Sequence, residues 1–164
     1  MKKVIVIGCP GSGKSVFSRA LAKVTGLPVY HLDMMYWNAD GTKVGRDVFR
    51  RILAETMAKD EWIIDGNYGS TMEWRFGEAD TVFFLDYPTE ICLQGIAQRR
   101  GKPRPDMPYI ESSEDTDFTD FVREYNENSR PGVLRLIEAN PEKDTVIFHS
   151  REESEKYLQK LRQQ

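Results

Sequence analysis

The sequence is poor in the residues that most often hold metals or form cross-links. Its 164 residues include two cysteines and two histidines, and Cys9 and Cys92 lie far apart with no metal-binding or redox spacing. Long apolar runs are also missing, so the sequence predicts no membrane-spanning helix. Met1-Lys2-Lys3 leads directly into the first expected strand, which leaves no room for a targeting segment. A reducing cytoplasm is the expected setting.

The sequence also lacks a large excess of either positive or negative charge. The formal net charge is −3, and the basic residues gather only locally, at Arg99, Arg100, Lys102 and Arg104. Such a chain has no global positive field, which argues against direct nucleic-acid binding. The hydrophobic share of 40% and the charged share of 30% are ordinary for one globular domain, which we expect to span residues 1–164. The sequence does not predict the oligomeric state.

One motif dominates what is present. Residues 8–15, Gly-Cys-Pro-Gly-Ser-Gly-Lys-Ser, match the P-loop pattern G-x-x-x-x-G-K-[ST] at each fixed position. A β-branched run at 4–7 precedes the motif, and apolar residues at helical spacing follow it over 16–24. Strand, loop and helix therefore come in the order that a nucleotide-binding loop requires. The nucleotide is expected to contact Gly8, Pro10, Gly11, Ser12, Gly13, Lys14, Ser15 and Val16.

The chemistry of this loop follows from its backbone. Gly11 and Gly13 allow successive N–H groups to point inward at a helix N-terminus, where an anion is stabilised. Lys14 would reach the β- and γ-phosphates of ATP, and the Ser15 hydroxyl would ligate Mg²⁺. The alternative is a glycine-rich packing turn that binds nothing, but such a turn has no need of lysine followed by serine.

Strand and helix signals alternate along the chain, which predicts an α/β fold with a parallel sheet. Strands are expected at 4–7, 27–32, 62–64, 81–85 and 145–148, with 81–85, the most hydrophobic, at the centre. Helices are expected at 16–24, at 46–59, after Pro88, over 118–139 with a bend at Pro131, and from a capping box at Ser150. Residues 69–79 are expected to be irregular. The proline-rich stretch 99–117 is expected to be a mobile surface excursion.

Acidic residues stand where three expected strands end, at Asp33, Asp65 and Asp86. Ligands of open parallel sheets sit beyond the carboxyl ends of the strands. Asp33 and Asp65 could therefore hold the water shell of Mg²⁺ or polarise an attacking group. Each could equally be a turn residue or a helix cap, and Asp86 is the one best explained in that way.

Arginines and aromatic residues supply further candidates. Guanidinium groups stabilise the charge that spreads over a transferring phosphoryl group, and the candidates are Arg75, Arg99, Arg100, Arg104 and Arg130. Each could instead be a solvated surface charge. The residues Met35, Tyr36, Trp37 and Tyr68 could wall a pocket for a planar or apolar acceptor, or could belong to the core. No role is assigned to His31 or His149.

The chain resembles the topology modulation protein family, a branch similar to adenylate kinase and shikimate kinase. The resemblance lies in the P-loop, His-Leu-Asp at 31–33 with Trp37, and Trp-Ile-Ile-Asp-Gly-Asn-Tyr at 62–68. Arg-Pro-Asp-Met at 104–107 and Asn-Ser-Arg-Pro at 128–131 extend it nearly from end to end. It implies a three-layer P-loop NTPase fold, with a five-stranded parallel sheet of order 2-3-1-4-5.

The resemblance also implies a lid over 99–117 and an acceptor-binding region within 33–60. Adenylate kinases carry Asp-Gly-Phe-Pro-Arg where this chain has Asp65-Gly66 followed by Asn-Tyr-Gly, so the arginine that would grip an AMP phosphate is missing there. Arg75 could substitute for it. The acceptor is therefore expected to meet Asp33, Trp37, Gly66, Tyr68 and Arg75.

Two functions remain after the sequence is read. The first is an ATP-dependent, Mg²⁺-requiring kinase of a small acceptor, with a nucleoside monophosphate among the possible acceptors. Its catalytic residues would be Lys14, Asp33, Asp65, Arg99, Arg104 and Arg130, with Arg99 also contacting the nucleotide. The second is a nucleotide-binding regulator that affects DNA topology with little catalysis, and its only support is the basic cluster at 99–104.

Overall fold

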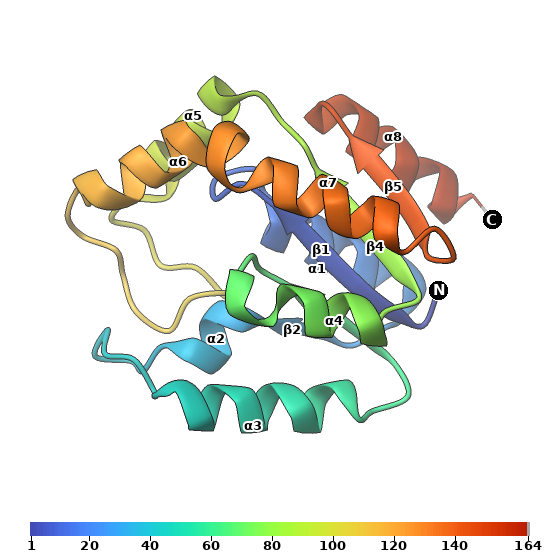
Figure 1. The fold of residues 1–164 in the computed structure, drawn as a ribbon. Helices are drawn as coiled ribbons and strands as arrows, with labels where there is room; N and C mark the ends of the chain where they lie inside the picture. Colours follow the sequence, from blue (N-terminus) through green and yellow to red (C-terminus); the bar gives the residue numbers. More distant parts are fainter. Residues whose placement is uncertain (164) are drawn as a thin grey trace.

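A five-stranded parallel sheet forms the centre of the protein in a computed structural model that describes residues 1–163 (Figure 1). Gln164, the last residue of the expected domain, lies outside the described residues. The strands are β1 (Lys3–Gly8), β2 (Val29–His31), β3 (Trp62–Asp65), β4 (Thr81–Leu85) and β5 (Asp144–Phe148). They pair in the order β2-β3-β1-β4-β5, which confirms the expected topology.

Helices cover both faces of this sheet, which makes the three expected layers (Figure 1). One face packs against α1 (Lys14–Thr25), α5 (Thr89–Arg99), α6 (Thr116–Asn128) and α8 (Arg151–Arg162). The other packs against α2 (Leu32–Tyr36), α3 (Arg46–Met57), α4 (Met72–Glu78) and α7 (Arg130–Ala139). None of the helices within residues 1–163 is long and apolar enough to cross a bilayer.

The two cores follow from the two-residue period of a strand. In β1, Val4 and Val6 pack on the face of α1, whereas Ile5 and Ile7 pack on the face of α3, and all four are fully buried. A strand that is buried on both faces has a continuous run of apolar residues, which is typical of parallel sheets. This burial fixes the carboxyl end of β1, and therefore the P-loop, in the middle of the sheet edge.

The prediction that residues 69–79 are irregular is wrong. They form a short 3₁₀ turn, η1 (Gly69–Thr71), followed by the helix α4. Met72 and Phe76, four residues apart, are buried together against the sheet, and this tertiary packing stabilises a helix that contains Gly77. Glycine at that position lowers the intrinsic helix propensity, so the local sequence concealed the helix.

Other expected elements differ from the structure in detail. The helix expected over 118–139 is divided at Ser129 into α6 and α7, with Pro131 in the first turn of α7, where a missing N–H does not matter. The strand β4 lies inside the sheet, but β1 occupies the middle. Asp33 does not close the second strand, because it lies in the short helix α2. Residues 100–115 form no helix or strand, as expected of the excursion.

Candidate active site

A cavity of about 1490 Å³ opens at the carboxyl end of the sheet, and the P-loop forms its floor. The loop turns tightly because Gly11 and Gly13 adopt φ values of +84° and +94°, which residues with a side chain rarely adopt. Gly11 also touches α5, since a Cβ built there would lie 2.0 Å from the Cys92 carbonyl oxygen. The P-loop is therefore packed closely against the N-terminal half of α5.

Lys14 and Ser12 show how this floor fits an anion. The Lys14 ammonium donates hydrogen bonds to the carbonyl oxygens of Gly8 and Cys9, at 2.9 and 3.1 Å, and burial lowers its pKa below the ordinary value. Among the described residues, the buried Ser12 hydroxyl finds no hydrogen-bond partner. A buried hydroxyl without a partner is costly, and a phosphate oxygen in the loop would satisfy it. The expected nucleotide contacts from Pro10 to Val16 all line the cavity.

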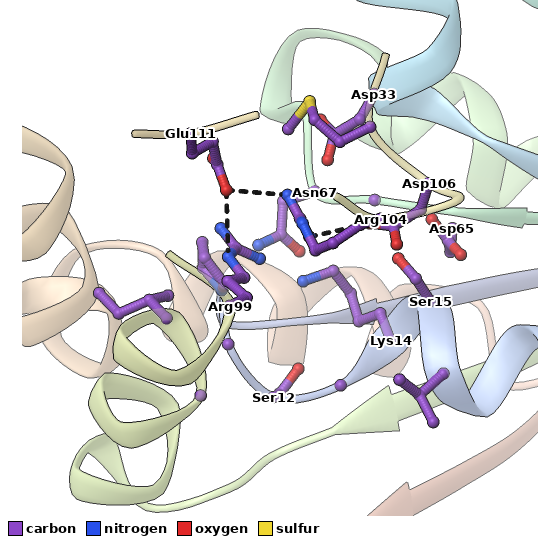
Figure 2. Close-up of a pocket in the computed structure, with 18 of the residues that line it drawn as sticks. Ser12, Lys14, Ser15, Asp33, Asp65, Asn67, Arg99, Arg104, Asp106 and Glu111 are labelled. Carbon is purple, nitrogen blue, oxygen red and sulfur yellow. Dashed lines mark hydrogen bonds and ion pairs between the residues drawn. The ribbon is translucent and has the colours of Figure 1, made fainter. Parts of the chain in front are cut away.

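Asp33 lies on the wall opposite the P-loop, in the region of α2 (Figure 2). The Tyr68 hydroxyl donates a hydrogen bond of 2.6 Å to Asp33 Oδ1. Burial raises the pKa of Asp33, although this hydrogen bond and the charge of Lys14 act in the opposite direction. The carboxylate is thus placed to meet a hydroxyl group that enters the cavity from the side of α2.

Aromatic rings surround Asp33. Tyr36 packs against Tyr68 at a centroid distance of 4.8 Å and against Trp37 at 4.9 Å, and Trp37 meets Tyr109 of the segment 100–115 at 5.6 Å. All four rings line the cavity, whereas Met35 is a core residue. Of the four residues expected to wall a pocket, Tyr36, Trp37 and Tyr68 line the cavity and Met35 does not.

Asp65 and Asp106 lie near Ser15, the expected magnesium ligand (Figure 2). Asp65 is paired with His31, whose Nδ1 lies 2.6 Å from Asp65 Oδ2, so the histidine left without a role orients this carboxylate. Burial alone would raise the pKa of Asp106, but the charges of Arg104, His31 and Arg19 hold it below the ordinary value.

Ser15, Asp65 and Asp106 are the groups that could hold a magnesium ion. No group of three or more histidine, cysteine or acidic side chains within residues 1–163 could hold a metal by itself. Mg²⁺ characteristically keeps several waters and takes one or two protein oxygens besides substrate phosphates. The Ser15 hydroxyl with Asp65 and Asp106 behind it fits that pattern.

Two arginines reach the cavity from the end of α5 and from the segment 100–115. Arg104 donates from Nη2 to Glu111 Oε2 and from Nη1 to Asp106 Oδ2, each at 2.9 Å. Arg99, at the end of α5, pairs with the same Glu111 oxygen at 3.5 Å and lies over the ring of Phe118. Arg100 also lines the cavity, where it pairs with the exposed Glu114 at 3.7 Å. The structure therefore brings Arg99 and Arg104 together near Lys14 (Figure 2).

Arg75 does not lie where the sequence analysis expects it. It is fully buried, does not line the cavity, and donates hydrogen bonds to the carbonyl oxygens of Gly66, Asn67 and Tyr68. Burial lowers its pKa to about 9. Tyr68 has a positive φ of +26°, a strained conformation for a residue with a side chain. Arg75 thus stabilises the loop that presents Tyr68 and does not bind an acceptor phosphate.

Arg130 is also outside the cavity lining. Its guanidinium makes two hydrogen bonds of 2.8 Å to the buried carboxylate of Asp86, which lies at the end of β4. His149 approaches the same carboxylate at 3.6 Å. This arrangement does not fit the predicted catalytic role of Arg130, and it supports the interpretation of Asp86 as a structural residue. Gly8, one of the expected nucleotide contacts, also does not line the cavity. Its N–H group donates a hydrogen bond to Asn67 Oδ1.

The sequence analysis missed several residues of this site, among them Arg19, Asn67, Asp106 and Glu111. Asn67 and Asp106 stand inside the two segments that carry the family resemblance, Asp-Gly-Asn-Tyr and Arg-Pro-Asp-Met, so a signal was present. Arg19 follows Ser15 by four residues on the same helix, which is a local signal, whereas Glu111 has none, because only the folded segment 100–115 brings it to the cavity. The two cysteines are buried in one core, where the Cys9 thiol donates to the Val122 carbonyl oxygen and the Cys92 thiol donates to the Tyr87 carbonyl oxygen.

Comparisons with known proteins support the fold. No protein-family model matches the chain, and no curated protein sequence matches it. Among solved structures, a shikimate kinase from Acinetobacter baumannii in complex with shikimate has a TM-score of 0.67 at 18% identity, over 99% of this chain and 92% of that one. A shikimate kinase from Bacteroides thetaiotaomicron gives 0.58 at 18% identity, over 98% and 96% of the two chains.

A gluconokinase from Sinorhizobium meliloti is similar as well, with a TM-score of 0.56 at 18% identity over 99% of this chain and 94% of the other. The resemblance to topology modulation proteins is not confirmed by these comparisons and stays a prediction. Identity at this level establishes the architecture and leaves the acceptor open. The chain has the P-loop kinase fold that shikimate kinase and gluconokinase share.

Proposed function

We propose that this protein is an ATP-dependent kinase that transfers the γ-phosphoryl group of Mg-ATP to a small acceptor. One observation carries the proposal. A single cavity has the P-loop with Lys14 and Ser15 on its floor, Asp33 on the opposite wall, and Arg99 and Arg104 at its lid. In this proposal residues 1–164 form one domain, residues 33–60 surround the acceptor, and residues 99–117 are the lid.

The floor and the lid would bind the phosphates. The N–H groups of the P-loop and the Lys14 ammonium would hold the β- and γ-phosphates. Arg99 and Arg104 would stabilise the charge on the transferring group, because guanidinium groups in a dry site act strongly on developing charge. Mg²⁺, when bound between Ser15 and the phosphates, would neutralise part of their charge. Closure of residues 99–117 would exclude water, which would otherwise hydrolyse ATP.

Asp33 would receive the proton of the acceptor. The acceptor oxygen would attack the γ-phosphorus while the bond from that phosphorus to the bridging oxygen breaks and ADP leaves. Asp33 Oδ1 already accepts from Tyr68, so Oδ2 would take the proton. The raised pKa of Asp33 brings this carboxylate closer to the operating pH, as a general base requires.

The groups around Asp33 favour an uncharged acceptor that carries hydroxyl groups. Within residues 1–163, no arginine of α3 or α4 lines the cavity, and Arg75 is committed to backbone carbonyls. The cation on this side is Lys43, which lies about 6 Å over the rings of Tyr36 and Trp37 at the exposed rim. A buried carboxylate repels anions, whereas aromatic rings and a tyrosine hydroxyl suit a ring-shaped polyol or a nucleoside. A nucleoside monophosphate is therefore the less favoured acceptor.

The first experiment tests nucleotide binding. Calorimetry with Mg-ATP should show one site in the wild type and none in Lys14→Ala. Lys23→Ala is the matched control, because Lys23 is an exposed lysine on the same helix. Equal binding by the wild type and Lys14→Ala would remove the P-loop from the proposal.

The second experiment tests the acceptor. ADP release is measured with pairs that differ in charge, namely adenosine and AMP, methyl shikimate and shikimate, and gluconolactone and gluconate. The uncharged member should have the higher kcat/KM in each pair that reacts. A preference for the charged member would contradict the proposed acceptor class but not the kinase reaction. ATP turnover that never exceeds background would contradict both.

No observation favours the alternative regulator that touches DNA. Arg99 and Arg104, two of the four residues in its basic cluster, are paired with acids inside the cavity, and Arg100 is paired with Glu114. Direct binding driven by phosphates would weaken steeply with salt. A fluorescence anisotropy titration with duplex DNA at low salt remains the direct test.

A further inference from the structure

The charged residues over the P-loop form one continuous chain of alternating sign. It runs from Arg99 through Glu111, Arg104 and Asp106 to Arg19 on α1. The last step joins Asp106 Oδ1 to Arg19 Nη1 at 3.3 Å. Figure 2 shows Arg104 between Glu111 and Asp106, with Asp106 beside Ser15. These five residues are called the lid ion-pair chain below.

Asp106 is the point at which the lid meets the nucleotide-binding helix. It is 3% exposed, although it belongs to a segment without helix or strand, and the neighbouring Met107 is 8% exposed. A buried carboxylate is costly unless charged donors pair with it. Here the two donors come from different parts of the protein, Arg104 from the lid and Arg19 from α1. The closed position of the lid therefore depends on Arg19 as much as on the lid itself.

Arg19 is well placed to join the lid to the P-loop. It follows Ser15 by four residues on α1, so the two side chains lie on the same face of the helix. The two limbs of the lid are joined as well, because the Gly101 N–H group donates to the Glu111 carbonyl oxygen at 2.7 Å. The chain contains three guanidiniums and two carboxylates, which leaves one positive charge for a phosphoryl group.

We propose that Arg19 and Asp106 are positioning residues that dock the lid on α1 and hold Arg104 over the phosphate end of the P-loop. The docking itself follows from the ion pairs. The effect on the nucleotide rests on the proposed kinase function. Arg104 then acts on the transferring group because its second partner, Asp106, is fixed to the helix that begins with Lys14.

The lid contains a matched control for this proposal. Arg100 and Glu114 form an ion pair at 3.7 Å, but their side chains are 36% and 61% exposed and the pair does not touch the lid ion-pair chain. Exposed pairs of this kind contribute little to stability. Glu114→Gln therefore removes a charge from the lid without affecting the docking.

The first measurement is hydrogen–deuterium exchange over residues 100–111 without nucleotide. Arg19→Gln should accelerate exchange by about tenfold, the effect of losing one charge-assisted hydrogen bond, and Asp106→Asn by more, because Asp106 also pairs with Arg104. The double variant should exchange no faster than the faster single variant, since both remove the same contact. Arg19→Lys should partly restore protection, and Glu114→Gln should exchange like the wild type. Arg19 is partly exposed, so the Arg19 variants are expected to fold and to test the docking independently of the buried Asp106.

The second measurement is Mg-ATP affinity by calorimetry, with kcat and KM for the acceptor that reacts. Arg19→Gln should raise the Kd for Mg-ATP by about tenfold, lower kcat, and leave the acceptor KM unchanged. Exchange in Arg19→Gln equal to that in Glu114→Gln would overturn the docking. Faster exchange with wild-type Kd and kcat would overturn the positioning role. Faster exchange in a protein that binds no Mg-ATP would leave the docking intact and refute the proposed function instead.

Discussion

The contact between the P-loop and α5 gives a prediction whose two components can be measured separately. In Gly11→Ala the new Cβ would lie 2.0 Å from the Cys92 carbonyl oxygen and 3.0 Å from Ile96 Cγ2, and it would also occupy a φ of +84°. The steric overlap costs about 2 kcal/mol, as overpacking does, and the strained φ costs about 1 kcal/mol. The sum of about 3 kcal/mol should lower Tm by about 6–12 °C in a domain of this size.

Two other glycines separate these components. Gly13→Ala has a φ of +94° with no atom within 4 Å of the new Cβ, so it should cost only about 1 kcal/mol. Gly95→Ala places a Cβ 2.0 Å from the Gly11 carbonyl oxygen inside the helix α5, so the overlap of about 2 kcal/mol is offset by about 1 kcal/mol of helix propensity.

The assay is urea unfolding followed by far-UV circular dichroism, with thermal melts as a second measure. Gly11→Ala should be the least stable of the three variants, and the other two should lie closer to the wild type. The reasoning would be refuted if Gly11→Ala melted within about 1 °C of the wild type, or if Gly13→Ala lost as much stability as Gly11→Ala.

Three further predictions concern charged groups. Lys14→Met should keep the fold but weaken Mg-ATP binding about ten- to one-hundredfold, the loss of one charge-assisted hydrogen bond, as calorimetry can check. Burial raises the pKa of Asp33, so ionisation of this carboxyl group lowers the free energy of unfolding as the pH rises above the ordinary value of 3.8. Asp33→Asn should therefore raise Tm more at pH 7 than at pH 4. Thermal melts across that range that show no pH dependence of this gain would contradict the assignment. Arg130→Gln leaves the buried Asp86 without its main partner and should cost about 1–2 kcal/mol in urea unfolding, with an unchanged Kd for Mg-ATP. A large loss of nucleotide affinity in that variant would show that Arg130 contributes to nucleotide binding.

The fold was predictable because its signals are local. The apolar run Val4–Ile7, the P-loop after it and the alternation of strands with amphipathic helices define a parallel sheet with helices on both faces. The strand order came from the resemblance to the topology modulation protein family. The helix α4 was not predictable in the same way, because Met72 and Phe76 stabilise it only through contact with a sheet that is distant in sequence.

The candidate site was predictable only in part. Asp65 at the end of β3 and Asp33 two residues after β2 were predictable because the topology brings the carboxyl ends of the strands to one edge. Arginines were ambiguous, since a long side chain in a loop or helix can point into the cavity, as Arg104 does, or be buried against carbonyls, as Arg75 is. The direction depends on which acceptors the folded chain leaves unpaired, and a single sequence does not show that.

The two buried thiols allow opening of the P-loop to be measured by chemical labelling. The neighbouring Cys92 thiol, together with burial, raises the pKa of the Cys9 thiol, so reactive thiolate at this position is scarce while the P-loop stays packed on α5. Since the chain has no other cysteine, the uptake of a maleimide dye by the native protein would time the excursions of the P-loop away from that helix. A ligand that binds the P-loop should slow the rate of dye uptake in proportion to its occupancy, without any engineered label.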